Sequence, residues 1–126
     1  MQKLKPLRWV GRSREDLRAM PADVRRNIGY ALQFAQAGTK HPSAKPLRGF
    51  SGAGVLEVVE DHRGDTYRAV YTVRFSEAVY VLHAFRKKSK SGVKTPKNEM
   101  ELIRLRLRRA EEEHRRAIRL AKGDSP

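Results

Sequence analysis

Three strand-like segments follow one another with only short turns between them, and this spacing constrains the fold most. The segments are Val55 to Asp61, Thr66 to Arg74 and Ala78 to Phe85. The turns at residues 62–65 and 76–77 are too short for a helical crossover, so successive strands must run antiparallel. We therefore expect an antiparallel meander at the centre of the protein.

The middle segment alternates between two faces. Tyr67, Ala69, Tyr71 and Val73 share one face, and Arg68, Val70 and Thr72 share the other. A permanent charge beside Val70 is costly unless it has a partner, and Glu57 on the neighbouring strand can supply one. Two interpretations remain open: a structural ion pair, or an arginine that binds a phosphate, with Glu57 orienting it or acting as a base.

Two helices are expected before these strands. Ser13, with Asp16 three residues later, resembles a capping box that starts a short helix running to Met20. A second, amphipathic helix follows from Pro21 to about Ala37, ending at Gly38. Leu7 to Val10 is expected as a brief strand, and residues 39–54 as a loop.

The tail is predicted to form one long helix over residues 96–120, capped by Thr95, with residues 122–126 frayed. Its apolar stripe lies at spacings of three and four residues, and comprises Met100, Ile103, Leu107, Ala110, His114 and Ala117. We expect this stripe to cover the protein's own sheet rather than receive a partner. The whole chain, residues 1–126, is predicted to be a single domain.

Charge points to a polyanionic partner. Lys and Arg number 28 against 14 Asp and Glu, which gives a net charge of +14. An uninterrupted cationic run follows the last strand, made of Arg86, Lys87, Lys88, Lys90, Lys94 and Lys97. Such an excess attracts nucleic acid, an anionic membrane or an acidic protein. The run is equally consistent with a solvated, merely basic loop.

Several classes of site are excluded or disfavoured. The chain has no cysteine, no Gly-rich phosphate loop and no GxSxG elbow, and its four histidines lack the short spacings of a zinc site. No metal or other cofactor is therefore expected. Alternation along the last strand places His83 on one face with Val79, Val81 and Phe85. His83 and His114 are interpreted first as packing residues. Without a signal-peptide core or a membrane-length apolar run, we expect a cytoplasmic protein with no membrane partner.

RNA cleavage without a metal needs few groups. A base helps the 2′-hydroxyl attack phosphorus, fixed cations stabilise the charge that develops on the phosphoryl oxygens, and an acid protonates the leaving 5′-oxygen. Cations of the sheet and of the loop after it suit the second role. The residues alone do not identify the base.

Several motifs together resemble the RelE/HigB superfamily of type II toxins, in particular its phage-derived branch. They are Lys45-Pro46-Leu47-Arg48-Gly49, Tyr67-Arg68-Ala69-Val70-Tyr71, Leu82-His83-Ala84-Phe85-Arg86-Lys87-Lys88 and Lys94-Thr95-Pro96. The resemblance implies an α+β fold in which two N-terminal helices pack on a small antiparallel sheet, followed by a long C-terminal helix. It also implies a metal-independent endoribonuclease that cleaves mRNA in the ribosomal A site, and a co-encoded antitoxin, typically a helix-turn-helix protein.

Residue by residue, the resemblance assigns catalytic roles to Arg68, which matches the family arginine at the scissile phosphate, and to Lys87 or Lys88 at the end of the last strand. Arg48 matches the Leu-Arg-Gly loop, and Lys45 lies beside it. We expect these two to bind RNA together with Arg86, Lys90 and Lys94 of the cationic run.

This chain differs from RelE in two features that bear on the general base. RelE carries lysines on the strand where this chain has Glu57 and Glu60, and no tyrosine follows Tyr80 to match the RelE tyrosine near the C-terminus. Glu57 and His83 are the remaining candidates. The alternative hypothesis is a non-catalytic basic module that binds RNA or the ribosome.

Overall fold

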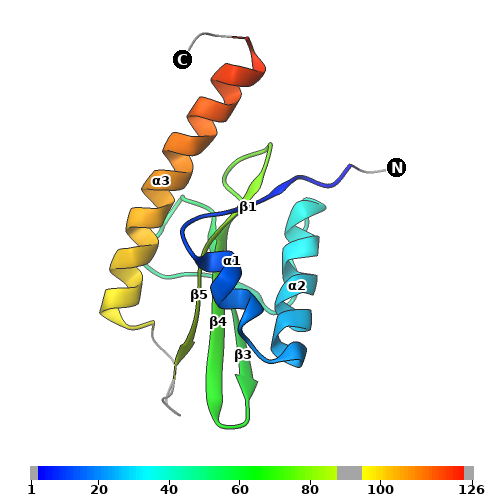
Figure 1. Ribbon diagram of the computed structural model, residues 1–126, viewed down its shortest axis with the longest axis vertical. Helices are drawn as coiled ribbons and strands as arrows, with labels where there is room; N and C mark the ends of the chain where they lie inside the picture. Colours follow the sequence, from blue (N-terminus) through cyan, green and yellow to red (C-terminus); the bar gives the residue numbers. More distant parts are fainter. Residues whose placement is uncertain (1–2, 88–94, 124–126) are drawn as a thin grey trace.

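The computed structural model describes residues 3–87 and 95–123. The chain begins with one strand and two helices, continues with four consecutive strands and ends with a single helix (Figure 1). In chain order the elements are β1 (Leu7–Trp9), α1 (Ser13–Arg18), α2 (Ala22–Gln36), β2 (Ala44–Pro46), β3 (Val55–His62), β4 (Asp65–Thr72), β5 (Val79–Lys87) and α3 (Lys97–Ala121). The predicted α+β class and the predicted helices are confirmed.

The strands described form one five-stranded sheet in the order β1-β5-β4-β3-β2. Strands β2 to β5 pair antiparallel, which confirms the meander, whereas β1 joins β5 in parallel. Arg63 and Gly64, both at positive φ, connect β3 to β4 in a two-residue turn suited to the twist of a hairpin. β2 was not predicted, because it is a three-residue strand within a segment rich in turn-forming residues.

Each face of the sheet carries its own apolar core. α1 and α2 cover one face, where Ile28, Val58 and Tyr71 are buried together. α3 covers the other face, where Ile103 packs with Val70 and other buried residues. Figure 1 shows α2 and α3 on opposite sides of the strands. The tail helix therefore packs on the protein's own sheet, as expected.

A bulge in β5 changes which side chains share a face. Val70 pairs with His83 but Tyr71 pairs with Val81, so Leu82 has no partner residue on β4. Such an insertion shifts the alternation by one residue. The prediction that His83 lies on the face of Val79 and Val81 is therefore wrong: those two pack under α1 and α2, and His83 lies with Leu82 on the α3 face.

Two local predictions are also corrected. Ser13 does not cap α1: it is the first helical residue, and its buried hydroxyl donates to the Val81 carbonyl oxygen at 3.1 Å, which ties α1 to β5. Ala117 is exposed, because the C-terminal end of α3 extends beyond the sheet (Figure 1). Among the described helices, none combines the length and apolarity needed to span a membrane.

Replacing Ile103 by Ala tests the packing of α3. Ile103 is fully buried against the sheet, so the substitution should lower the free energy of unfolding by about 2–5 kcal/mol in urea denaturation. Leu105→Ala is the matched control, because Leu105 is 46% exposed on the same helix and its loss should cost no more than about 0.5 kcal/mol. Equal effects of the two substitutions would contradict this packing.

Candidate active site

Arg68 lies buried on the α3 face of β4, where its guanidinium is held by two neighbours. Its Nη1 donates to Glu57 Oε2 at 3.2 Å and to Thr95 Oγ1 at 3.1 Å. The Arg68 side chain is 2% exposed and that of Glu57 15%. The predicted partnership of Arg68 and Glu57 is thus confirmed, and Arg68 lies beneath the surface rather than on it.

Thr95 has a different role from the one predicted. Pro96 occupies the N-cap position of α3, and no side-chain hydrogen bond caps this helix end. The Thr95 hydroxyl instead accepts from Arg68 and approaches Glu57 Oε2 at 3.5 Å. Thr95, which lies just before α3, therefore contacts both members of the ion pair in the sheet.

Two predicted cationic residues lie on the same face as this pair. Lys45 of β2 is opposite Glu57 in the strand register and is exposed. Lys87 of β5 is opposite Thr66, so it follows Phe85, the partner of Arg68, on that face. The structure brings Lys45, Glu57, Arg68 and Lys87 to one face of the sheet, carried by four strands.

The other predicted RNA-binding residues lie elsewhere. Arg86 points to the opposite face at the end of β5, where it is opposite Tyr67 and forms an ion pair with Asp65 at 3.5 Å. Arg48 is exposed in the connection after β2. Lys88, Lys90 and Lys94 lie outside the described residues.

His83 joins the sheet to α3 through both of its ring nitrogens. Its Nε2 is hydrogen-bonded to Glu99 Oε2, and its Nδ1 lies 3.1 Å from Nη1 of the buried Arg106. Arg106 Nη1 also donates to the Leu82 carbonyl oxygen at 3.0 Å. Because of the bulge, the Leu82 carbonyl oxygen and the His83 imidazole both contact the guanidinium of Arg106.

These contacts determine the tautomer of His83. A guanidinium only donates hydrogen bonds, so Nδ1 must accept and the proton must reside on Nε2, facing Glu99. Burial lowers the pKa of His83 below its ordinary value, although the nearby Glu99 carboxylate opposes that shift. His83 is therefore a neutral donor to Glu99 at pH 7.

The sequence reasoning missed Glu99 and Arg106. Arg106 lies between Ile103 and Ala110 on the buried stripe of α3, and a charge on such a stripe is a signal that a partner exists. A second signal is Gly11, at φ +58°, where a Cβ atom would meet the Arg106 guanidinium at 2.9 Å. Nothing in the sequence pattern linked either residue to His83.

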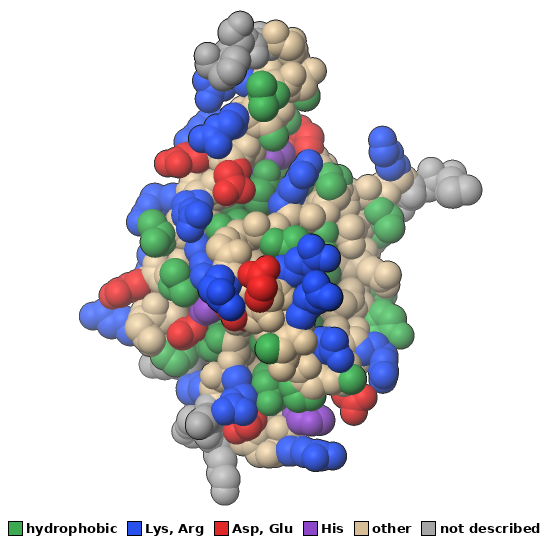
Figure 2. Space-filling model, in the orientation of Figure 1, with side chains coloured by type: hydrophobic (Ala, Val, Ile, Leu, Met, Phe, Trp, Pro, Cys, Tyr) green, Lys and Arg blue, Asp and Glu red, His purple; other side chains and the backbone are tan. Residues whose placement is uncertain are grey.

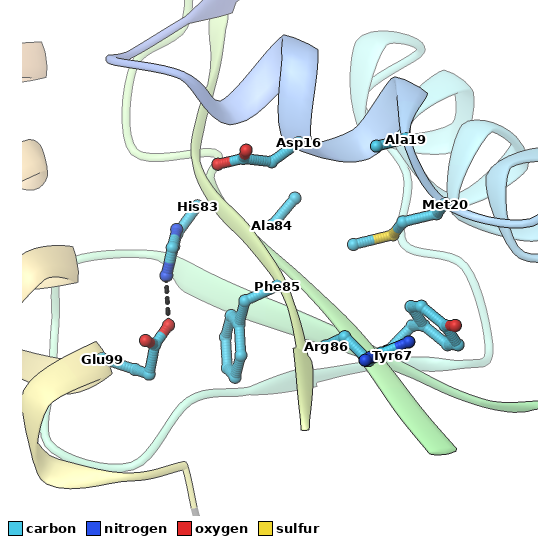
Figure 3. Close-up of a pocket in the computed structure, with 9 residues that line it drawn as sticks. All are labelled: Asp16, Ala19, Met20, Tyr67, His83, Ala84, Phe85, Arg86 and Glu99. Atoms are coloured by element: carbon cyan, nitrogen blue, oxygen red, sulfur yellow. Dashed lines mark hydrogen bonds and ion pairs between the residues drawn. The ribbon is translucent and has the colours of Figure 1, made fainter. Parts of the chain in front are cut away.

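A cleft of about 410 Å³ opens beside this network. Figure 3 shows Glu99 and Phe85 on one side of β5, Met20 and Tyr67 on the other, and Asp16 of α1 above them. The ring of Phe85 stacks on that of His83, with centroids 4.8 Å apart. The cleft therefore combines carboxylates, an imidazole and aromatic surface.

The remaining buried histidine belongs to a separate cluster. His114 of α3 stacks on Phe75 with centroids 4.2 Å apart, and its Nε2 lies 2.8 Å from Glu77 Oε1. Hydrogen bonding from His114 lowers the pKa of the exposed Glu77 carboxyl group. The expectation that His114 is a packing residue is confirmed. Within residues 3–87 and 95–123, no cluster of His, Asp or Glu could hold a metal ion.

The fold and this site define a basic α+β protein with ionisable groups enclosed between a sheet and its C-terminal helix. Residues 15–108 match the family described as "Phage derived protein Gp49-like (DUF891)". The chain belongs to this family. The match confirms the predicted resemblance to the phage-derived branch of the RelE/HigB superfamily. Comparison with curated proteins gives no match.

The chain is also similar to chains of two solved structures. One is the Escherichia coli toxin RelE, as a double arginine mutant in the free state, at 21% identity and a TM-score of 0.49 over 64% of this chain and 81% of that one. The other is from the RelBE2 toxin–antitoxin complex of Mycobacterium tuberculosis, at 22% identity and a TM-score of 0.41 over 71% and 98% of the two chains.

Arg68→Ala should destabilise the protein. The substitution leaves Glu57 without its guanidinium partner in a largely buried position, which typically costs about 3–5 kcal/mol of unfolding free energy. Arg26→Ala is the control, because its ion pair with Asp23 is exposed and contributes at most about 1 kcal/mol. If urea denaturation gives the same small loss for both, Arg68 is not the buried partner described above.

The pH dependence of stability should reflect His83. Because its folded-state pKa is lowered, the unfolded chain binds a proton that the folded chain does not as the pH falls below about 6.5. Unfolding free energy should therefore decrease through that window, by up to about 1.4 kcal/mol per pH unit. NMR titration of the His83 ring gives the pKa directly, and His83→Gln should show a shallower decrease. A His83 midpoint above 6.5 would contradict the assignment.

Proposed function

We propose that this protein is the toxin of a type II toxin–antitoxin system and cleaves mRNA on the ribosome without a metal ion. Its family membership supports the proposal. The observation that carries it is the shared face of Glu57, Arg68, Lys45 and Lys87. His83 lies on the same face, paired with Val70, which in turn pairs with Glu57. These are the residue types that phosphodiester cleavage without a metal requires.

In this proposal the cations of the face divide into two groups. Lys45 is exposed and Lys87 is half-buried at the end of β5, so both can reach the phosphates of an RNA strand. Arg68 lies beneath Thr95, and it can contact a phosphate only after the start of α3 moves away. Arg68 otherwise acts by holding Glu57 in position.

The surface charge favours encounter with RNA. Figure 2 shows Lys and Arg side chains distributed along α3 and over the neighbouring elements, with fewer acidic side chains among them. With a net charge of +14, the field of the whole protein raises the local concentration of polyanions. The same field suits an acidic antitoxin, which would neutralise the toxin by covering this surface; we propose a helix-turn-helix protein as that partner.

A second candidate function is binding of RNA or the ribosome without cleavage. The burial of Arg68 and its pairing with Glu57 favour this alternative, because a guanidinium already paired with a carboxylate is a poor phosphate ligand. The binding module and the enzyme lead to the same expectations wherever those expectations follow from net charge alone. Only the appearance of a cleaved product separates it from the enzyme.

Cleavage is tested with purified protein, programmed ribosomes and end-labelled mRNA in the presence of a chelator. We expect cleavage in the A-site codon that persists without divalent ions beyond those retained by the ribosome. Induced expression should likewise stop growth and produce new mRNA 5′ ends. Intact mRNA together with strong ribosome binding would favour the alternative over the enzyme.

The exposed cations make a separate prediction. Lys45→Ala and Lys87→Ala should each weaken RNA binding and lower the magnitude of the slope of log affinity against log salt by about 0.7, because each removes one phosphate contact on a single strand. Lys122→Ala, exposed at the far end of α3, is the control for loss of one charge and should leave the slope nearly unchanged. An equal change of the slope in all three variants would mean that RNA does not bind at a defined position on the protein surface.

A further inference from the structure

We propose that Glu99 is the general base of the RNA cleavage, held in place by His83 and Arg106 and acting in the cleft along the edge of β5. The inference rests on the proposed function and names a residue for the one role that sequence analysis left open. It assigns to His83 and Arg106 the role of positioning residues rather than direct contact with substrate.

The cleft lies where β5 has no second strand beside it. β1 pairs with Val79 to Val81 only, so from His83 onward the described part of β5 is paired on one side alone. The volume of about 410 Å³ falls within the roughly 300–1,000 Å³ of sites that enclose small ligands. The Phe85 ring lies beside Glu99 (Figure 3) and offers a surface on which a nucleobase can stack.

Glu99 is both fixed and accessible. It belongs to the first turn of α3, where the N-terminal amide groups favour a carboxylate. One of its oxygens, Oε2, is engaged with His83 Nε2, and the side chain remains 23% exposed. A carboxylate has two acceptor oxygens, so Oε1 can receive a proton from substrate while Oε2 stays bound.

Glu99 is the least engaged of the three candidate bases. Because His83 is a neutral donor, it orients the carboxylate without cancelling its charge. The other candidate, Glu57, is already paired with the guanidinium of Arg68 and also contacts Thr95. His83 itself has both ring nitrogens occupied, by Glu99 and by Arg106. Of the three groups, Glu99 is therefore the best placed to accept a proton.

The step removes a proton from the 2′-oxygen, adds one to the 5′-oxygen and exchanges one bond at phosphorus. The 2′-hydroxyl proton passes to Glu99 Oε1 while the 2′-oxygen bonds to phosphorus. The bond from phosphorus to the 5′-oxygen then breaks, and that oxygen takes a proton from water. Glu99 returns its proton to the resulting hydroxide, which restores the carboxylate and the water. The products are a 2′,3′-cyclic phosphate and a free 5′-hydroxyl, so phosphorus is neither oxidised nor reduced.

The decisive variant is Glu99→Gln, because the amide oxygen can still accept the hydrogen bond from His83 but cannot take a proton. We expect its single-turnover cleavage rate on programmed ribosomes to fall at least about 100-fold, the usual lower bound for loss of a general base. Melting temperature and affinity for an mRNA with a 2′-deoxy scissile nucleotide should stay unchanged. Glu101→Gln, at an exposed position two residues further along α3, controls for loss of one acid.

Glu99→Asp keeps the experiment decisive if the glutamine variant folds poorly. Asp retains a carboxylate, so this variant should cleave at least tenfold faster than Glu99→Gln; equal rates in the two would overturn the inference. So would a Glu99→Gln rate within threefold of wild type. A wild-type protein that binds programmed ribosomes without cutting mRNA overturns the proposed function, and the inference with it.

His83→Gln tests the positioning role. The variant should lower kcat while leaving KM unchanged, because the base is misplaced but the RNA path is intact. The loss should be smaller than that in Glu99→Gln, since the carboxylate is still present. A rise in KM at constant kcat would instead assign His83 to substrate binding and overturn its positioning role.

Discussion

The contact between α3 and the sheet is the constraint on which the rest of this structure depends, because it encloses charged and ionisable groups. Arg68, His83 and Arg106 are all buried there. Burying a charge is unfavourable unless partners compensate for it. Each of the three has such partners: Glu57 and Thr95 for Arg68, Glu99 for His83, and the Leu82 carbonyl oxygen for Arg106. The position of α3 is therefore determined by electrostatic pairing as well as by apolar packing.

Much of this arrangement could be predicted from local patterns. Alternation in β4 correctly divides Tyr67, Ala69 and Tyr71 from Arg68 and Val70, because a strand has a period of two residues. The same alternation places Arg68 on a buried face and so requires an acid on a neighbouring strand. Spacings of three and four residues likewise define α2 and the buried half of α3. Each of these inferences uses residues within one element or one hairpin.

The features that escaped prediction depend on contacts between distant elements. The bulge at Leu82 reverses the face of His83, and no residue type in the apolar run of β5 marks its position. Ser13 and Thr95 both look like helix caps, yet their hydroxyl groups bind Val81 and Arg68 across the fold. Arg106 is on the correct stripe of α3, but its partners belong to β5, 23 and 24 residues away. Tertiary partners decide the role of short polar side chains that local rules assign to caps.

The separation of charge within the molecule bears on the choice between an enzyme and a binding module. The positive excess lies mainly outside, where it attracts any polyanion and carries no information about chemistry. The groups able to move a proton lie inside, between β5 and α3, and sum to little net charge because Glu57 and Glu99 accompany Arg68 and Arg106. Binding of RNA alone does not require a neutral imidazole that donates to a partly exposed carboxylate beside an aromatic ring. This internal network, rather than the net charge, is what favours the catalytic interpretation.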